Sequence, residues 1–397
     1  MLKENNILLT LPPLSLYIHI PWCVQKCPYC DFNSHALKAD IDEELYIRHL
    51  LADLDADIKR FALNDSSQQR PLYSIFIGGG TPSLFSSNAI AQLLTAVFKR
   101  FPQHDDPNFE IEVTLEANPG TVEADKFKGF NDAGVNRLSI GVQSFASDKL
   151  IKLGRIHDSE QAIRAAIIAQ ECGINSFNLD LMHGLEQQSV AGALDDLKQA
   201  IALKPKHLSW YQLTIEPNTS FYSKPPTLPN DDVLWDIQQQ GWQLLKDAGY
   251  QQYEISAYSK GADNQCKHNL NYWQNGDYLG IGCGAHGKIT STKDNTIYRT
   301  VKVKHPKGYM DEERAHLCQV HNVPEAERPF EYMMNRLRLF KPFCLTDYQA
   351  TTGLSPDGVI EALQSAKNKQ LVTENNGYWQ VTQQGHRYLN DLLSLFL

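Results

Sequence analysis

The chain of 397 residues has no apolar run that approaches the roughly 20 residues a membrane-spanning helix needs. It also lacks a basic excess, because 37 Lys and Arg stand against 46 Asp and Glu and the formal net charge is −9. Surfaces that bind nucleic acid usually carry the opposite charge. We therefore expect no nucleic-acid partner and no transmembrane segment, while a peripheral membrane contact is left open.

The N-terminus lacks the pattern of a secretory signal peptide. It has one early lysine, Lys3, and Pro12 and Pro13 interrupt its short apolar run. No A-x-A-like cleavage site precedes the first expected strand. These features predict a cytoplasmic protein, in which thiols stay reduced. Clustered cysteines in that compartment indicate metal or redox chemistry rather than disulfides.

The sequence does contain a repeated alternation of short β-rich runs and helical patterns, which is typical of parallel strands joined by crossover helices. For the first helix, Asp40 is the expected N-cap, with Glu43 three residues later. Six such units predict an α/β fold, a partial (β/α)6 TIM-like barrel with its reactive groups on the loops after the strands. The expected strands cover 15–20, 72–77, 110–116, 136–142, 176–182 and 207–215.

The pattern changes after about residue 300. Two helical patterns are followed by two β-rich halves around Asn375-Asn376-Gly377, which predict a hairpin, and by a final helix. This order resembles a winged-helix module. Residues 355–397 hold three basic residues against four acidic ones, so we expect a structural or partner-contacting role. The predicted domains are 1–300, the barrel, and 301–397, a smaller helical, winged-helix-like domain.

Three of the eight cysteines, Cys23, Cys27 and Cys30, form a C-x3-C-x2-C group directly after the first expected strand, with no fourth cysteine nearby. Structural zinc usually needs four ligands. His19 or His35 could complete such a set, so a zinc-binding scaffold remains one alternative. A 4Fe–4S cluster held by three cysteines would instead leave one iron open to a ligand from outside the protein.

The cysteine spacing, with the aromatic Tyr29 just before the third cysteine, is similar to that of the radical S-adenosylmethionine (SAM) superfamily. The resemblance implies that the amino and carboxylate groups of SAM chelate the open iron. It also implies that an electron from the cluster splits SAM and releases a 5′-deoxyadenosyl radical. The run GGGTP at 78–82 matches the glycine motif that holds the methionine end of SAM in this superfamily.

From residue 17 to about residue 287, the chain closely resembles the oxygen-independent coproporphyrinogen oxidase family of radical SAM proteins. Asp180 also stands out without the resemblance, because it interrupts the apolar run FNLDLM and a buried carboxylate needs a partner. By position, the SAM contacts implied by the resemblance are Tyr17, Gly79, Gly80, Thr81, Glu116, Gln143, Arg155 and Asp180.

Two branches of that family differ in their motifs. The true oxidases carry a further cysteine where this chain has Phe32, and they have a longer N-terminal segment. Residues 268–273 instead read H-N-x-x-Y-W, the signature of the HemW-type haem chaperones. This resemblance implies a carrier that binds haem as cargo and passes it to haem-requiring proteins such as respiratory enzymes. The alternative is a coproporphyrinogen III oxidase, a radical SAM enzyme of porphyrin biosynthesis.

The haem site has several candidate residues. His268 is a candidate axial ligand, because neutral imidazole suits iron. Tyr272 is a candidate for stacking on the porphyrin, as its neighbour Trp273 is. Cys266 and His286 are rival iron ligands.

Overall fold

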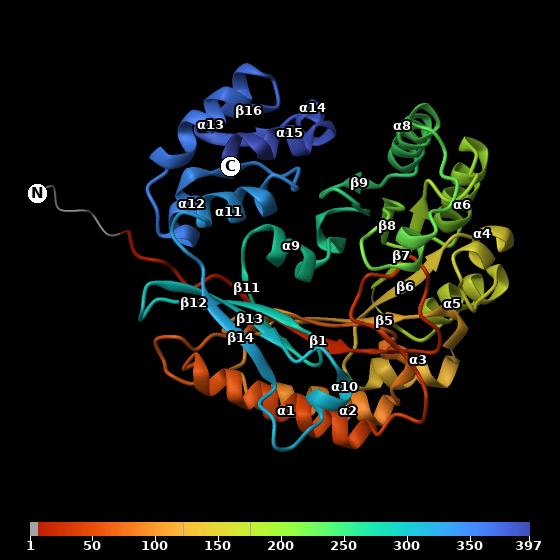
Figure 1. The fold of residues 1–397 in the computed structure, drawn as a ribbon, viewed down its shortest axis with the longest axis horizontal. Coiled ribbons are helices and arrows are strands. Elements are labelled where there is room, and N and C mark those ends of the chain that lie inside the picture. The colour runs from red at the N-terminus through yellow and green to blue at the C-terminus, as the bar shows by residue number, and fades with distance from the viewer. Residues whose placement is uncertain (1–6, 122, 175) are drawn as a thin grey trace, which may run out of the picture.

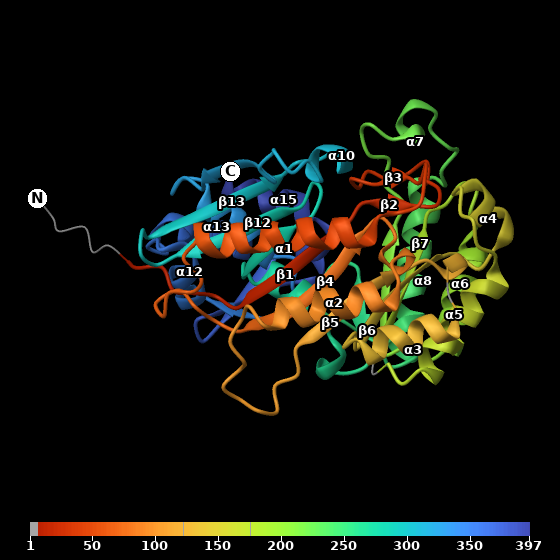
Figure 2. The same ribbon diagram turned by 90° about the horizontal axis from the view of Figure 1, so that it is seen from below.

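The structure, a computed structural model, describes residues 7–121, 123–174 and 176–397. All six predicted strands are present and lie side by side in parallel, with helices covering one face of the curved sheet (Figures 1 and 2). The fold is therefore α/β, a partial (β/α)6 barrel. In sheet order these strands are β1 (Leu14–Ile20), β4 (Leu72–Gly79), β5 (Glu112–Ala117), β6 (Arg137–Gln143), β7 (Ser176–His183) and β8 (His207–Gln212).

The longer helices that follow these strands bury one apolar face against the sheet. The predicted start of the first helix was wrong by two residues. The carboxylate of Asp42, not that of Asp40, accepts the N–H of Leu45 at 2.9 Å, so the helix begins at Glu43. The helices of this part are α1 (Glu43–Arg60), α2 (Ser87–Phe98), α3 (Ala124–Asp132), α4 (Ser147–Lys152), α5 (Ser159–Glu171), α6 (Val190–Ala202), α7 (Ser220–Ser223) and α8 (Asp231–Asp247).

The barrel does not close, because both edges of the parallel sheet carry further strands. Beyond β8 lie the antiparallel β10 (Ala257–Ser259) and β9 (Gln251–Gln252). Beyond β1 lies the parallel β11 (Asp277–Ile281), which is followed by the antiparallel β12 (His286–Ser291), β13 (Thr296–Lys302) and β14 (Leu317–Asn322). The domain boundary at residue 300 stays a prediction, and β13 and β14 continue the large sheet past it.

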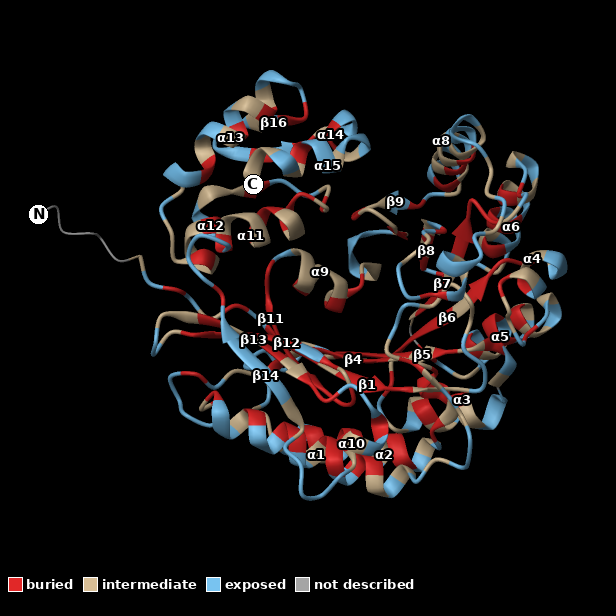
Figure 3. Ribbon diagram, in the orientation of Figure 1, coloured by how far each residue is buried: buried red, intermediate tan, exposed pale blue. Residues whose placement is uncertain are grey.

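The two faces of the parallel strands have different partners. Buried apolar residues such as Ile18 and Leu115 belong to one continuous core between strands and helices (Figure 3). Alternate residues are polar and bond one another inside the barrel: Ser15 contacts Ser74 at 2.8 Å, and Asn178 donates to Ser139 at 2.9 Å. The helix α9 (Lys267–Trp273) packs against β4 and β1 on this inner side.

The C-terminal part has its own core around Tyr332, Phe343 and Trp379. The predicted hairpin is confirmed, with Asn376 and Gly377 at φ 52° and 82°, as a mirror-image turn requires. The elements are α11 (Arg328–Arg336), β15 (Phe343–Cys344), α12 (Leu345–Thr352), α13 (Asp357–Asn368), β16 (Val372–Asn375), β17 (Tyr378–Val381), α14 (Gln383–Arg387) and α15 (Leu389–Leu393).

None of the helices within the described ranges combines the length and the apolar character needed to cross a membrane.

Three short elements complete the fold: the strand pair β2 (Trp22–Cys23) and β3 (His35–Ala36), and the helix α10 (Pro306–Tyr309).

Candidate functional site

The three clustered cysteines lie on the loop that leaves β1 at its C-terminal end. All three thiols are free and half-buried, and they face one cavity of about 390 Å³, the barrel cavity. The loop turns back on itself where the N–H of Cys30 donates to the carbonyl of Cys27 at 3.1 Å. The short β2–β3 pair ties the two ends of the loop together. The first strand therefore presents three thiols together at the mouth of the barrel.

The glycine run after β4 lets two backbone segments approach each other closely. The N–H of Gly80 donates to the carbonyl of Ile20 at 2.7 Å, and that of Thr81 donates to the carbonyl of Trp22 at 2.8 Å. A Cβ on Gly80 would lie 2.5 Å from the Trp22 carbonyl oxygen, and Gly79 has φ 114°. Only glycine fits this approach without displacing the cysteine loop.

Two largely buried carboxylates face the barrel cavity from β5 and β7, the strands on either side of β6. Glu116 accepts the N–H of Gly79 at 2.9 Å. Asp180 accepts hydrogen bonds from Ser139 at 2.9 Å and from Asn178 at 2.7 Å. Burial raises the pKa of both carboxyl groups, and repulsion from Asp180 adds to the rise for Glu116, whose pKa reaches about 7. A cationic ligand in the cavity would favour the ionised forms.

Gln143 and Arg155 complete the rim of the cavity beside the cysteines. A bulge near the end of β6 gives Gln143 a φ of 69° and turns it into the cavity, where Tyr211 donates to its amide oxygen at 3.1 Å. The guanidinium of Arg155 donates to the carbonyl of Gly141 at 2.6 Å and to the sulfur of Cys27 at 3.6 Å. A positive charge is thus held against the thiol cluster.

The structure brings most of the predicted residues into this one cavity and separates three of them from it. The cysteines, Gly79, Gly80, Thr81, Glu116, Gln143, Arg155 and Asp180 all line the barrel cavity. Tyr17 and Tyr272 line a neighbouring cavity of about 610 Å³, together with His286. His268 is only 3% exposed and lines neither of these two cavities.

His268 is held inside the protein by its neighbours. Its Nδ1 lies 3.0 Å from the hydroxyl oxygen of Ser74, and its ring stacks on Phe76 with the centroids 5.0 Å apart. Burial lowers the pKa of this imidazole to about 3, and Arg137 adds to the effect. The rival Cys266 is also buried, where its thiol donates to Glu112 at 3.3 Å. Direct access of a ligand to either side chain would need α9 to move.

Sequence reasoning missed several residues of the barrel cavity. Arg137 and Ser139 precede Gly141 and Gln143 at alternate positions of β6, and all four face the cavity. This period of two within a strand was a usable signal. Other lining residues were not evident from the strand pattern, because they follow strands irregularly or come from α9: Glu254, Ser256 and Asn269. Trp273, which the sequence indicated as a haem contact, lines this cavity instead.

The residues at the mouth of the barrel fit an iron–sulfur cluster better than a single zinc ion. No group of three or more His, Cys, Asp or Glu side chains in the described ranges is arranged to hold one metal ion. In a cluster each thiolate binds a different iron, so the thiols need not converge on one point. His19 is also committed elsewhere, since its ring nitrogens lie 2.9 Å from the Tyr17 hydroxyl and from the Asn33 carbonyl.

The partial barrel and the strand-end site together define the radical SAM class of proteins. The Radical SAM superfamily is matched over residues 17–197 and the HemN C-terminal domain over residues 323–388. The heme chaperone HemW of Haemophilus influenzae is 59% identical over 387 residues, 98% of this chain and 98% of that protein. The protein of the same name from Escherichia coli is 56% identical over 98% of this chain and 99% of its own length. The chain therefore belongs to the HemW family of radical SAM proteins.

Among solved structures, the chain is similar to coproporphyrinogen III oxidase (HemN) from Escherichia coli, with a TM-score of 0.79. The likeness covers 97% of this chain and 90% of that one, at 22% sequence identity. At this identity the likeness establishes the fold alone.

Proposed function

We propose that the chain is a haem chaperone that holds a 4Fe–4S cluster and SAM, binds haem as cargo and delivers it to haem-requiring proteins such as respiratory enzymes. The observation that carries this proposal is the end-to-end similarity to proteins named heme chaperone HemW, at 59% and 56% identity. Reduced, clustered thiols support a cytoplasmic setting.

In this proposal Cys23, Cys27 and Cys30 hold the cluster. When bound, cluster and SAM supply electron transfer to a sulfonium. Arg155 stabilises the negative charge of the thiolates from 3.6 Å at Cys27. The tightly packed turn at Gly79 and Gly80 keeps the cysteine loop in place over the cavity.

The remaining residues of the barrel cavity would bind and orient SAM. Glu116 and Asp180 offer carboxylate oxygens to its ammonium group, and binding a cation there lowers the pKa of both acids. Thr81 and Gln143 add neutral polar groups to the lining of the cavity. The cavity volume of about 390 Å³ suits one ligand of this size.

Oxidase activity is not part of the proposal. Phe32, at the position of the oxidases' additional cysteine, is 62% exposed on the cysteine loop, so it contributes no thiol and little cover. Radical chemistry on a bound substrate needs a site that excludes water.

The decisive experiment compares cargo transfer with turnover in the same anaerobic preparation. The chain is reconstituted with iron and sulfide, titrated with haem, and mixed with an apo-form of a haem protein. Parallel samples receive coproporphyrinogen III, SAM and a reductant. Haem binding and transfer without formation of protoporphyrinogen IX supports the chaperone. Sustained conversion of coproporphyrinogen, or no haem binding at all, would overturn it.

A further inference from the structure

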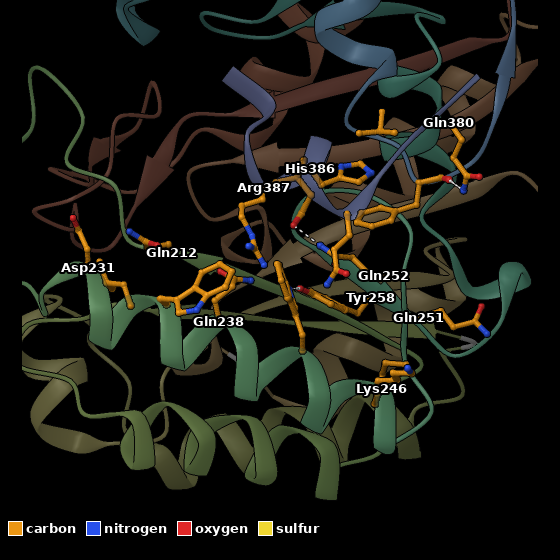
Figure 4. Close-up of a pocket in the computed structure, with 18 residues that line it drawn as sticks. Gln212, Asp231, Gln238, Lys246, Gln251, Gln252, Tyr258, Gln380, His386 and Arg387 are labelled. Carbon is orange, nitrogen blue, oxygen red and sulfur yellow. Dashed lines mark hydrogen bonds between the residues drawn. The ribbon is translucent and has the colours of Figure 1, made fainter. Parts of the chain in front are cut away.

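A cavity of about 860 Å³ lies between α8, the β9–β10 edge of the large sheet and the C-terminal part (Figure 4). It shares no residue with the barrel cavity. Its volume is more than twice that of the barrel cavity and falls within the usual range for bound cofactors. Nothing in the proposed cluster and SAM chemistry uses it.

Five aromatic side chains and His386 line this interdomain cavity, together with six glutamines. Trp235 and Trp242 lie two helical turns apart and therefore on the same face of α8. Trp242 donates to the hydroxyl of Tyr258 at 2.8 Å, which fixes both rings. Phe340 contributes a further ring from the C-terminal side. Flat aromatic walls of this kind favour a flat, apolar ligand.

One imidazole stands on the C-terminal wall with no hydrogen-bonding partner. The ring of His386 stacks on Phe340 with the centroids 3.8 Å apart and the planes 14° from parallel. Both of its ring nitrogens are covered, and neither forms a hydrogen bond. Burial lowers the pKa of His386 to about 4, so the ring is neutral at pH 7 and keeps a free lone pair. A buried imidazole without partners is costly unless a ligand uses it.

The charges around the interdomain cavity are separated along α8. Asp231 begins the helix and Lys246 lies 15 residues later, at the other end of the cavity (Figure 4). Arg387 lies over the ring of Trp235, 4.1 Å from its centroid, and also lines the cavity. Two cations beside aromatic walls suit a planar ligand that carries carboxylates.

We propose that haem, the cargo of the proposed function, binds in this interdomain cavity, with His386 as the iron ligand and Lys246 and Arg387 near the propionates. The inference rests on the proposed function. The rival ligands are His268, Cys266 and His286. His268, whose Nε2 also lacks a partner, and Cys266 are both sealed by α9. His286 lines the smaller neighbouring cavity of about 610 Å³, which includes Cys30 of the cluster loop, and the barrel cavity has the volume for SAM and not for a porphyrin as well. A small shift of α14 would expose the ring nitrogens of His386 to the ligand. The walls of the cavity come from two parts of the chain, so moving these two parts away from each other would release the haem.

The test uses the full chain, reconstituted anaerobically, in three forms: wild type, His386→Phe and His321→Phe. Phenylalanine at 386 keeps a ring against Phe340 but offers no nitrogen. His321 is an exposed histidine on β14 and serves as the matched control. Each form is titrated with ferric haem by absorption in the Soret region and with metal-free protoporphyrin IX by quenching of tryptophan fluorescence.

We expect His386→Phe to lose the imidazole-ligated Soret band and to weaken haem binding by roughly tenfold or more. Its affinity for protoporphyrin IX should stay within about threefold, since the aromatic walls remain. The control should match wild type with both ligands. Haem binding that is unchanged in His386→Phe, or a loss of both ligands together, would overturn the interdomain site while the chaperone proposal stands. Wild type that binds no haem would overturn both.

Discussion

Arg155 donates a hydrogen bond from its guanidinium to the sulfur of Cys27 at 3.6 Å, across 128 positions of the chain. The same side chain donates to the carbonyl of Gly141 at 2.6 Å, which holds the charge in place. A fixed cation beside a thiolate stabilises the negative charge of the thiolate and of any group bound to it.

Removing this charge should make the bound cluster harder to reduce. Arg155→Gln deletes a positive charge that favours the more negative, reduced state, so the reduction potential should fall. Potentiometric titration followed by electron paramagnetic resonance measures the shift. Lys152→Gln, which removes a cation paired with Glu186 on the surface of α4, is the control and should leave the potential unchanged. Equal potentials in wild type and Arg155→Gln would contradict the role given to this contact.

Each cysteine of the loop should be needed for the cluster. Alanine at 23, 27 or 30 removes one of three iron ligands, so the brown chromophore and the bound iron and sulfide should be lost. Cys172→Ala and Cys344→Ala should keep the iron content of wild type, because these thiols lie elsewhere in the fold. Iron and acid-labile sulfide analysis after anaerobic reconstitution measures this. A full cluster in the Cys27→Ala variant would refute the ligand assignment.

SAM binding should depend on the carboxylates of Glu116 and Asp180. Glu116→Ala or Asp180→Ala removes a charge contact to the ammonium group of SAM, with a loss of about 1.5–3 kcal/mol of binding free energy. Isothermal titration of the reconstituted protein gives the affinity, and the iron content should not change. Glu216→Ala, on the loop after β8, serves as a control. If both variants bind SAM as wild type does, the proposed contacts are wrong.

The ionised carboxylate of Glu116 should also destabilise the folded chain when no ligand is bound. Its pKa is about 7 in the folded chain and 4.5 is the ordinary value, so between these two pH values the folded state holds a proton that the unfolded state has released. Stability therefore falls as pH rises through this window. Without SAM, Glu116→Gln should be more stable than wild type by up to about 3 kcal/mol at pH 8, with the difference disappearing below pH 4. Thermal unfolding across this range is the measurement, and a pH-independent difference would count against a buried, titrating Glu116.

Gly80→Ala should disturb the cysteine loop directly. The added Cβ meets the carbonyl oxygen of Trp22 at 2.5 Å, a backbone atom that cannot rotate away, so we expect a loss of about 1–3 kcal/mol of stability and reduced cluster loading. The matched control is Gly358→Ala in α13, where a Cβ meets no atom within 4 Å. That variant should gain up to about 1 kcal/mol. Melting temperature and iron content together decide the outcome.

Features that depend on nearby residues could be predicted from the sequence. The six parallel strands were evident because each is a short β-rich run followed by a helical pattern. The Asn376-Gly377 turn was evident because its positive φ angles suit only a few residue types. The cysteine triplet was evident because its spacing alone brings three thiols onto one loop. These features depend on backbone preferences and on short stretches of chain.

The tertiary structure decided which distant residues meet. Pairing of β1 with β11 extended the sheet beyond the predicted strands. Hydrogen bonds between two strands do not depend on how far apart the strands lie in the sequence. The packing of α9 sealed His268 inside the protein, where its ring stacks on Phe76. The interdomain cavity needs α8 and His386, about 140 positions apart, and long-range packing of this kind leaves no local pattern in the sequence.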